Sequence, residues 1–240
     1  MQHELLVKQI SANMLYPTLL ALLEEAEENG DDNLANKIDK ISGWIEDCKT
    51  GLLTAKKLVG DFLRQFIADV WTYLDINYSS DEQLKAELLS DMTDADKYWY
   101  EKVFPAWLAK EDDKLSIWEN KIMNGSSGAD DEYLEQLAQA FEDRQDVAYL
   151  MRYIADFSMA TDMIVSYHRQ RACSLQLTTM QLKYCDEKIQ KWQDNLQYWQ
   201  IDRGIFVSFD PTEQAERIVN QVLWKTKSLE EGQYLKLEPR

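Results

Sequence analysis

Carboxylates are the one potentially reactive group that this chain has in abundance. Its 240 residues include 43 Asp and Glu against 26 Lys and Arg, a formal net charge of −17. Paired carboxylates perform general acid–base catalysis only where a cleft raises the pKa of one of them. Since any acidic helix places such pairs one turn apart, their number alone predicts no catalytic residue.

Histidine and cysteine form no recognisable metal site or catalytic pair. His3 and His168 are the two histidines, and neither belongs to a Glu-x-x-His motif or to a pair of histidines four residues apart. The cysteines Cys48, Cys173 and Cys185 lack the spacing of a zinc knuckle or of a disulfide framework. No glycine-rich phosphate loop or nucleophile elbow is present in the sequence. We therefore expect no catalytic residue, no metal and no cofactor.

Three acidic runs and three tryptophans are the candidate partner-binding residues. They are Glu24, Glu25, Glu27, Glu28, Asp31 and Asp32; Glu111, Asp112 and Asp113; Asp130, Asp131 and Glu132; and Trp99, Trp107 and Trp118. The tryptophans belong to a segment in which Tyr98, Trp99 and Tyr100 are consecutive, and one helix cannot turn three such rings inward. Exposed Trp side chains are favoured anchors in interfaces. The alternative is a two-sided core that buries every ring.

The elements that position these residues are predicted to be helices. Apolar residues recur at spacings of three and four over 34–48, 58–74, 147–164, 182–199 and 215–223. Only eight Gly and four Pro occur, fewer than turn-rich β proteins use. The segment 205–209 has a strand-like composition, but one strand makes no sheet, so we expect an extended connector there. The predicted fold is all-α, a multi-helix bundle of eight or more helices.

The predicted domain boundary lies at the only Gly/Ser-rich stretch, residues 124–129. It separates an acidic helical subdomain, 1–123, from a second helical subdomain, 130–240; one continuous domain is the alternative. Helix starts are predicted at Ser79 with Glu82, at Thr93 with Asp96, and at Asp210 before a proline.

Charge is unevenly distributed along the sequence. Residues 1–150 hold 31 acidic and 14 basic side chains, a net charge of −17, whereas residues 151–240 hold 12 of each. Such a field repels nucleic acid and membrane surfaces and attracts a basic partner. Arg152, Arg169 and Arg171 are the largest basic cluster, too small to predict direct nucleic-acid binding. The alternative is an acidic surface that only keeps the protein in solution.

The first apolar run, residues 12–23, contains Pro17 and leads into glutamates, unlike a signal peptide. No apolar stretch approaches the ~20 residues of a membrane-spanning helix. These features predict a cytoplasmic protein.

The sequence thus favours a non-enzymatic protein that binds a basic protein surface. The most specific form is an inhibitor of a nucleic-acid-binding protein or nuclease, as immunity, anti-restriction and anti-CRISPR proteins are, because rows of carboxylates can replace phosphates. One alternative is a helical adaptor or scaffold subunit, with a homodimer seam along the heptad stripe 182–199. Another is a helical-bundle enzyme with a carboxylate site.

Overall fold

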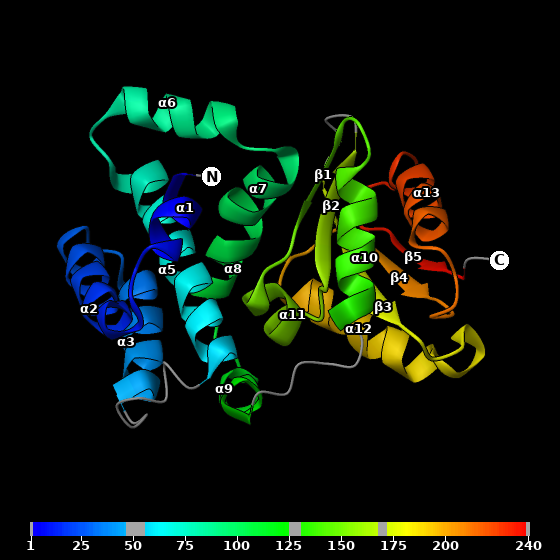
Figure 1. Cartoon of the computed structure of the whole chain (residues 1–240), viewed down its shortest axis with the longest axis horizontal. Helices are drawn as coiled ribbons and strands as arrows, with labels where there is room; N and C mark the ends of the chain where they lie inside the picture. The colour runs from blue at the N-terminus through cyan, green and yellow to red at the C-terminus, as the bar shows by residue number, and fades with distance from the viewer. Residues whose placement is uncertain (1, 47–55, 125–130, 168–171, 239–240) are drawn as a thin grey trace. The chain divides into compact units, whose positions relative to one another are not determined.

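The computed structural model describes residues 2–46, 56–124, 131–167 and 172–238 (Figure 1). The chain divides into two compact units. Unit 1 comprises residues 1–92 and 107–127, and unit 2 comprises residues 93–106 and 128–240. The unit boundary at 127–128 falls in the Gly/Ser-rich stretch, of which residues 125–129 lie outside the described residues. Residues 93–106, assigned to the first subdomain from the sequence, belong to unit 2.

Unit 1 is helical. Its helices are α1 (Gln2–Lys8), α2 (Ala12–Glu28), α3 (Asp32–Glu46), α5 (Lys57–Tyr78), α6 (Glu82–Asp91) and α9 (Leu115–Asn124). The predicted stripe on α3, from Leu34 to Ile45, is buried, and so is that on α5 from Phe62 to Leu74. Cys48, the last member of the first stripe, lies outside the described residues. Helical periodicity therefore identified the core faces of this unit.

An aromatic cluster fills the core of unit 1. The Trp118 ring lies 5.1 Å from Phe62 and 6.1 Å edge-on from Trp44, measured between ring centroids. Trp107 meets Phe66 edge-on at 6.1 Å. These are the offset and edge-to-face geometries that aromatic quadrupoles prefer, and they add to the free energy gained by burying the rings.

Unit 2 contains a five-stranded mixed sheet, so the prediction of an all-α, multi-helix bundle is wrong. The strands are β1 (Val147–Leu150), β2 (Met163–Tyr167), β3 (Cys173–Thr178), β4 (Gly204–Ser208) and β5 (Tyr234–Leu237), in the order β1-β2-β3-β4-β5. The first three pair antiparallel, and β3, β4 and β5 pair parallel. The expected extended connector at 205–209 is β4, and it pairs on both sides.

The strands were missed because they are short and because β4, in the middle of the parallel part of the sheet, is fully buried. The spacing over 147–164 that resembles one helix spans β1, the short helix α11 (Tyr153–Met159) and the start of β2. Every residue of β4 is buried, so it shows no alternation of polar and apolar residues. Short apolar runs of this kind cannot be separated from buried helix by periodicity.

Helices cover both faces of the sheet (Figure 1). On one face lie α10 (Asp131–Glu142) and α13 (Ala215–Thr226), whose apolar residues share a core with Ile205 and Val207. On the other lie α7 (Asp94–Tyr98), α11 and α12 (Asp186–Tyr198). Gly204 faces α12 so closely that an added Cβ would lie 2.7 Å from Leu196 Cδ1. Unit 2 is thus a three-layer α/β/α domain.

The parallel strands are joined by two crossovers of opposite hand. The chain steps from β3 through α12 to β4, then through α13 to β5, in the same direction across the sheet. Because α12 and α13 cover opposite faces, one of these crossovers is left-handed. Roughly 98% of such connections are right-handed, so this topology is a distinctive feature of the chain.

The heptad stripe over 182–199 packs inside unit 2. Cys185, Ile189, Trp192, Leu196 and Trp199 are all at most 3% exposed. Trp192 contacts Phe206 of β4 at 5.5 Å between centroids. The stripe is therefore occupied by the chain's own sheet and is not free to form the proposed dimer seam.

Helix starts follow the predicted chemistry in part. The Thr93–Asp96 capping box is present at α7. At α6 the cap is Asp81, not Ser79; its carboxylate accepts from the backbone N–H groups of Gln83 and Leu84. Asp210 accepts from Thr212 in a turn, and α13 begins later, at Ala215. Within the described residues, no helix combines the length and apolar character needed to cross a membrane.

Candidate functional site

The three tryptophans proposed as anchors are core residues. Trp99 and Trp107 are 0% exposed and Trp118 is 1% exposed. Trp99 packs on Phe104 in unit 2, whereas the other two belong to the aromatic cluster of unit 1. None of the three presents a ring to a partner, so the two-sided core is the correct alternative. The π-helical turn η1 (Trp99–Val103) helps to bury consecutive rings, because it rotates successive side chains differently from an α-helix.

The three residues of the run from Glu111 to Asp113 differ in burial and in their partners. Asp112 is buried, and its Oδ2 accepts from Trp107 Nε1 at 3.0 Å and from Trp118 Nε1 at 3.3 Å. Glu111 is exposed and pairs with Lys40 at 2.7 Å, which lowers the pKa of Glu111. Asp113 is exposed. Asp112 therefore satisfies two buried indoles and is removed from the candidate surface.

The run from Glu24 to Asp32 lies at the end of α2 and the start of α3. Asp31 is 8% exposed; it accepts from the Leu34 backbone N–H at 3.0 Å and from the Tyr78 hydroxyl at 2.8 Å. Asp32 is exposed in the first turn of α3, where the helix dipole favours a negative charge. Asp31 is thus a structural cap, and Asp32 is a favourable terminal charge.

Four exposed glutamates remain at the C-terminal end of α2: Glu24, Glu25, Glu27 and Glu28, here called the acidic end of α2. The negative end of the helix dipole lies there, so anionic side chains are unfavourable and cations would be stabilising. Burial, Asp75 and Glu28, in decreasing order, raise the pKa of Glu25. No basic residue lies in the last turn of α2. The placement of these anionic side chains at this end of α2 is therefore electrostatically unfavourable.

The side chains of the third predicted run, Asp130, Asp131 and Glu132, lie outside the described part of the structure. Asp130 lies outside the described residues. Asp131 and Glu132 begin α10, and their side chains are also outside the description.

The net charges of the two units differ from those of the two sequence segments, 1–150 and 151–240. Unit 1 has 21 acidic and 11 basic residues, a net charge of −10; unit 2 has 22 and 15, a net charge of −7. The boundary at residue 150, which separated acidic from neutral sequence, lies at the end of β1 inside unit 2. The acidic and neutral segments of the sequence therefore do not correspond to an acidic and a neutral unit.

A pocket of about 520 Å³ lies beyond the carboxyl ends of the parallel strands, where open α/β sheets bind ligands. Two of its carboxylates, those of Asp210 and Glu213, have partners, but Glu213 Oε2 is buried without a hydrogen-bond partner among the described residues. Asp210 accepts from the Thr212 backbone and hydroxyl, which lowers the pKa of Asp210. Glu213 lies 3.6 Å from Arg217. The described residues that line this Asp210 pocket include no histidine, cysteine or lysine.

A polar cluster lies near β3, on the face of the sheet that α12 covers. Asp162 Oδ2 accepts from Gln176 Nε2 at 2.7 Å and from the Leu177 backbone N–H. Burial, and then the neighbouring Asp156 carboxylate, raise the pKa of Asp162. Lys188 donates to the Thr178 hydroxyl at 3.0 Å. These hydrogen bonds join β3 to the segment before β2 and to α12, as expected of a structural network.

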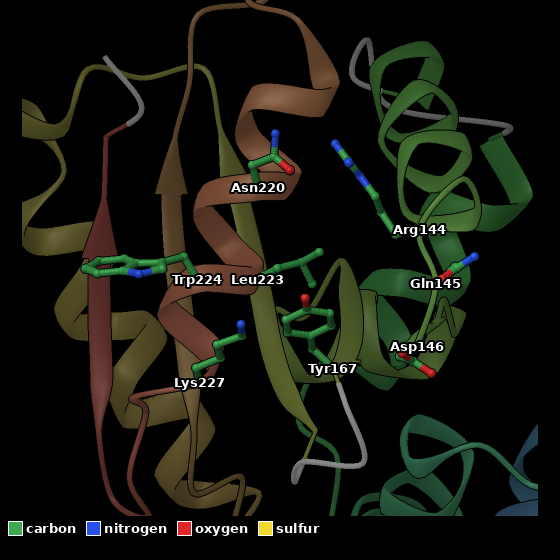
Figure 2. Close-up of a pocket in the computed structure, with 8 residues that line it drawn as sticks. All are labelled: Arg144, Gln145, Asp146, Tyr167, Asn220, Leu223, Trp224 and Lys227. Atoms are coloured by element: carbon green, nitrogen blue, oxygen red, sulfur yellow. The ribbon is translucent and has the colours of Figure 1, made fainter.

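A second pocket, of about 460 Å³, was not indicated by the sequence (Figure 2). Its lining residues are Arg144, Gln145, Asp146, Tyr167, Asn220, Leu223, Trp224 and Lys227, and we call it the Arg144 pocket. They come from the α10–β1 turn, the end of β2 and the last turns of α13. No short motif could have revealed it, since it combines three separate segments.

Comparison with known proteins gives no assignment: no family model, curated protein or solved structure matches the chain. Among the described residues, no group of three or more His, Cys, Asp or Glu side chains is placed to hold a metal ion.

Proposed function

We propose that the protein is a non-enzymatic binding protein whose acidic end of α2 engages a basic surface on a partner protein. The most specific form of the proposal is an inhibitor of a nucleic-acid-binding protein or nuclease in the cytoplasm. Carboxylates on the inhibitor would occupy the positions that phosphates take on the target. Glu111, through its pair with Lys40, and the buried Asp31 and Asp112 are excluded from this surface.

The observation that carries the proposal is the placement of four glutamates where a helix favours cations. Leu15, Leu19, Leu22 and Ala26 form the buried stripe of α2, so the glutamates are not needed for packing. A solubilising charge could have been placed at any exposed position without opposing the helix dipole. Charges that lower stability and are retained at a surface are typical of binding sites. Burial is the largest cause of the raised pKa of Glu25, and repulsion by Asp75 and Glu28 adds to it. A basic partner would offset this repulsion.

The test compares two variants with the same net charge. The first changes the acidic end of α2: E24Q, E25Q, E27Q and E28Q together. The matched control changes four exposed glutamates elsewhere, Glu82, Glu87, Glu101 and Glu135, to Gln. Tagged wild-type and variant proteins are used to capture partners from a lysate of the native organism, and captured proteins are identified by mass spectrometry.

We expect wild type and control to capture the same basic protein, and the α2 variant to lose it. Raising the salt concentration should release it from wild type, since exposed charges are screened over ~8 Å at physiological ionic strength. Equal capture by all three proteins, or a captured partner that is acidic, would contradict the proposal.

A further inference from the structure

The side of α2 that faces solvent carries a second regular stripe, besides the buried one. Five exposed residues recur at spacings of three, four, three and four, and we call them the outer stripe of α2: Met14, Pro17, Ala21, Glu24 and Glu28. Because successive residues of a helix are 100° apart, these five fall within an arc of about 80°. The helix packs against α3 and α5 (Figure 1), and its buried stripe runs from Leu15 to Ala26. The outer stripe is therefore one continuous surface along the exposed side of the helix.

The outer stripe changes from apolar to acidic along its length. Its first three residues are apolar, and Leu20 lies beside them on the exposed side. Met14 is 49% exposed and Leu20 is 38% exposed. The last two residues, Glu24 and Glu28, belong to the acidic end of α2 and form no ion pair with a residue that the structure describes. One helix face thus offers an apolar half followed by an anionic half.

The neighbouring helix α3 does not show such a face. Its exposed residues include no large apolar side chain; they are Asp32, Asn33, Asn36, Asp39, Lys40, Gly43 and Glu46. Single exposed apolar residues are ordinary on protein surfaces. Apolar residues aligned at spacings of three and four on one helix face are instead typical of helix recognition. The outer stripe of α2 therefore differs from an ordinary solvated helix face.

The spacing of the outer stripe favours a helix as its occupant. Side chains three and four residues apart form the ridges that pack between those of a second helix. With 17 residues, α2 is about 25 Å long, so a helix of similar length can follow it from end to end. The short side chain of Ala21, in the middle of the stripe, lets the two backbones approach closely. A flexible polycation would meet the glutamates but would leave Met14 and Leu20 exposed to water.

We propose that the outer stripe of α2 binds an amphipathic basic helix of the partner protein, with apolar side chains in one half and Lys or Arg in the other. This inference rests on the proposed function and adds the form of the partner and an apolar contact. The cations would meet Glu24 and Glu28, while the apolar side chains would cover Met14 and Leu20. Charge complementarity also fixes the register, because a displaced helix would place its cations against apolar residues.

Synthetic peptides test the proposal, because they replace the unidentified partner with a known chemistry. The first peptide is a helix of about 18 residues, near the length of α2, with leucines in one half of one face and arginines in the other half. The second has the same composition and net charge, but its leucines and arginines are distributed around the helix. Circular dichroism checks that both peptides are equally helical. Fluorescence anisotropy of each labelled peptide with the full chain measures its dissociation constant.

We expect the one-faced peptide to bind with a dissociation constant of about 100 μM or lower, at least about fivefold more tightly than the distributed peptide. Met14→Gln together with Leu20→Gln should weaken its binding about tenfold at low and at high salt, because the apolar contact is lost. Glu24→Gln together with Glu28→Gln should weaken it about tenfold at low salt only, because salt already screens these charges in wild type.

The matched control is Ile117→Gln together with Met180→Gln. These apolar side chains are 57% and 47% exposed and lie outside α2, so their replacement should leave peptide binding unchanged. Thermal unfolding of each variant checks that the fold is retained.

The proposal is overturned if the one-faced peptide does not bind, or if the control variant loses as much binding as the α2 variants. Equal binding of both peptides that still depends on Glu24 and Glu28 also overturns it, but leaves the proposed function standing, since charge alone then recognises a basic partner. Binding of the one-faced peptide that does not depend on these two glutamates contradicts the proposed function as well.

Discussion

The two units have similar net charges, −10 and −7, but differ in where charge is left without a partner. In unit 1 four exposed glutamates gather on the acidic end of α2. In unit 2 the cations Arg144 and Lys227 line one pocket, although the unit as a whole is acidic. Net charge therefore does not describe either surface. Local pairing decides which charged groups remain available to a ligand.

The units also differ in how they use buried polar groups. In unit 1, Asp112 satisfies two indole N–H groups within an aromatic core. In unit 2, Asp162 joins two segments of the polypeptide at the sheet. Both carboxylates are structural, whereas the exposed charges of each unit are the candidates for function.

The largest expected effect separates Asp112 from its neighbour Asp113. Asp112→Ala should lower the free energy of unfolding by about 3 kcal/mol, because it leaves two buried indole donors without their acceptor. Asp113→Ala should change it by less than about 0.5 kcal/mol, as is usual at an exposed position. Urea denaturation of both variants measures the difference, and equal stabilities would refute the assigned role of Asp112.

Two glycines, Gly204 in unit 2 and Gly43 in unit 1, compare a tightly packed position with an open one. Gly204→Ala should destabilise unit 2 by about 2 kcal/mol, since the new Cβ would lie 2.7 Å from Leu196 Cδ1 and Trp192 Cζ2. Gly43→Ala should stabilise unit 1 by roughly 0.5–1 kcal/mol, because Gly43 lies within α3 with nothing near an added Cβ. Thermal unfolding of the two variants should show shifts of opposite sign. A neutral Gly204→Ala would mean that α12 does not pack against β4 as described.

The carboxyl of Asp162 predicts a pH dependence of stability. Its pKa is raised in the folded state, so folding retains a proton that the unfolded chain releases above its ordinary value of about 3.9. The stabilising contribution is therefore present at low pH and is lost as the pH rises toward the folded pKa. Asp162→Asn keeps an acceptor for Gln176 and Leu177 but cannot ionise. Between about pH 5 and pH 8, the unfolding free energy of Asp162→Asn should rise relative to that of wild type by on the order of 1 kcal/mol. Parallel pH profiles of the two proteins would show that Asp162 is not the titrating group.

The smallest effect concerns the acidic end of α2. The E24Q, E25Q, E27Q and E28Q variant should be more stable than wild type by about 1 kcal/mol at neutral pH, because the unfavourable interaction with the helix dipole is removed. The control variant with Gln at Glu82, Glu87, Glu101 and Glu135 should gain less. A thermal melt in low salt measures both, and a destabilised α2 variant would show that these glutamates support the fold.

The sequence predicted unit 1 well because helices bury one continuous stripe. The stripe from Leu34 to Ile45 and that from Phe62 to Leu74 follow the helical period. Unit 2 could not be predicted in the same way. Its strands have four to six residues, and β4 is buried on both faces, so neither length nor alternation marks them.

The candidate sites were predicted less well than the helices, for physical reasons. Sequence shows that Glu111, Asp112 and Asp113 are adjacent, but not that one accepts from buried indoles and another pairs with Lys40. The Arg144 pocket depends on residues nearly 80 positions apart, Arg144 and Asn220 to Lys227. Only the acidic end of α2 was visible in advance, because its four carboxylates lie within a single helix.

The measurement that tests the central claim most directly is the association rate constant with the purified captured partner, by stopped-flow fluorescence, at about 50 and about 500 mM salt. We expect wild type and the control variant to associate much faster at low salt. The variant neutralised at the acidic end of α2 should associate slowly and with a flatter salt dependence, because its steering charge is gone. Rate constants and salt dependences that are the same for all three proteins would contradict the claim that the acidic end of α2 recognises the partner.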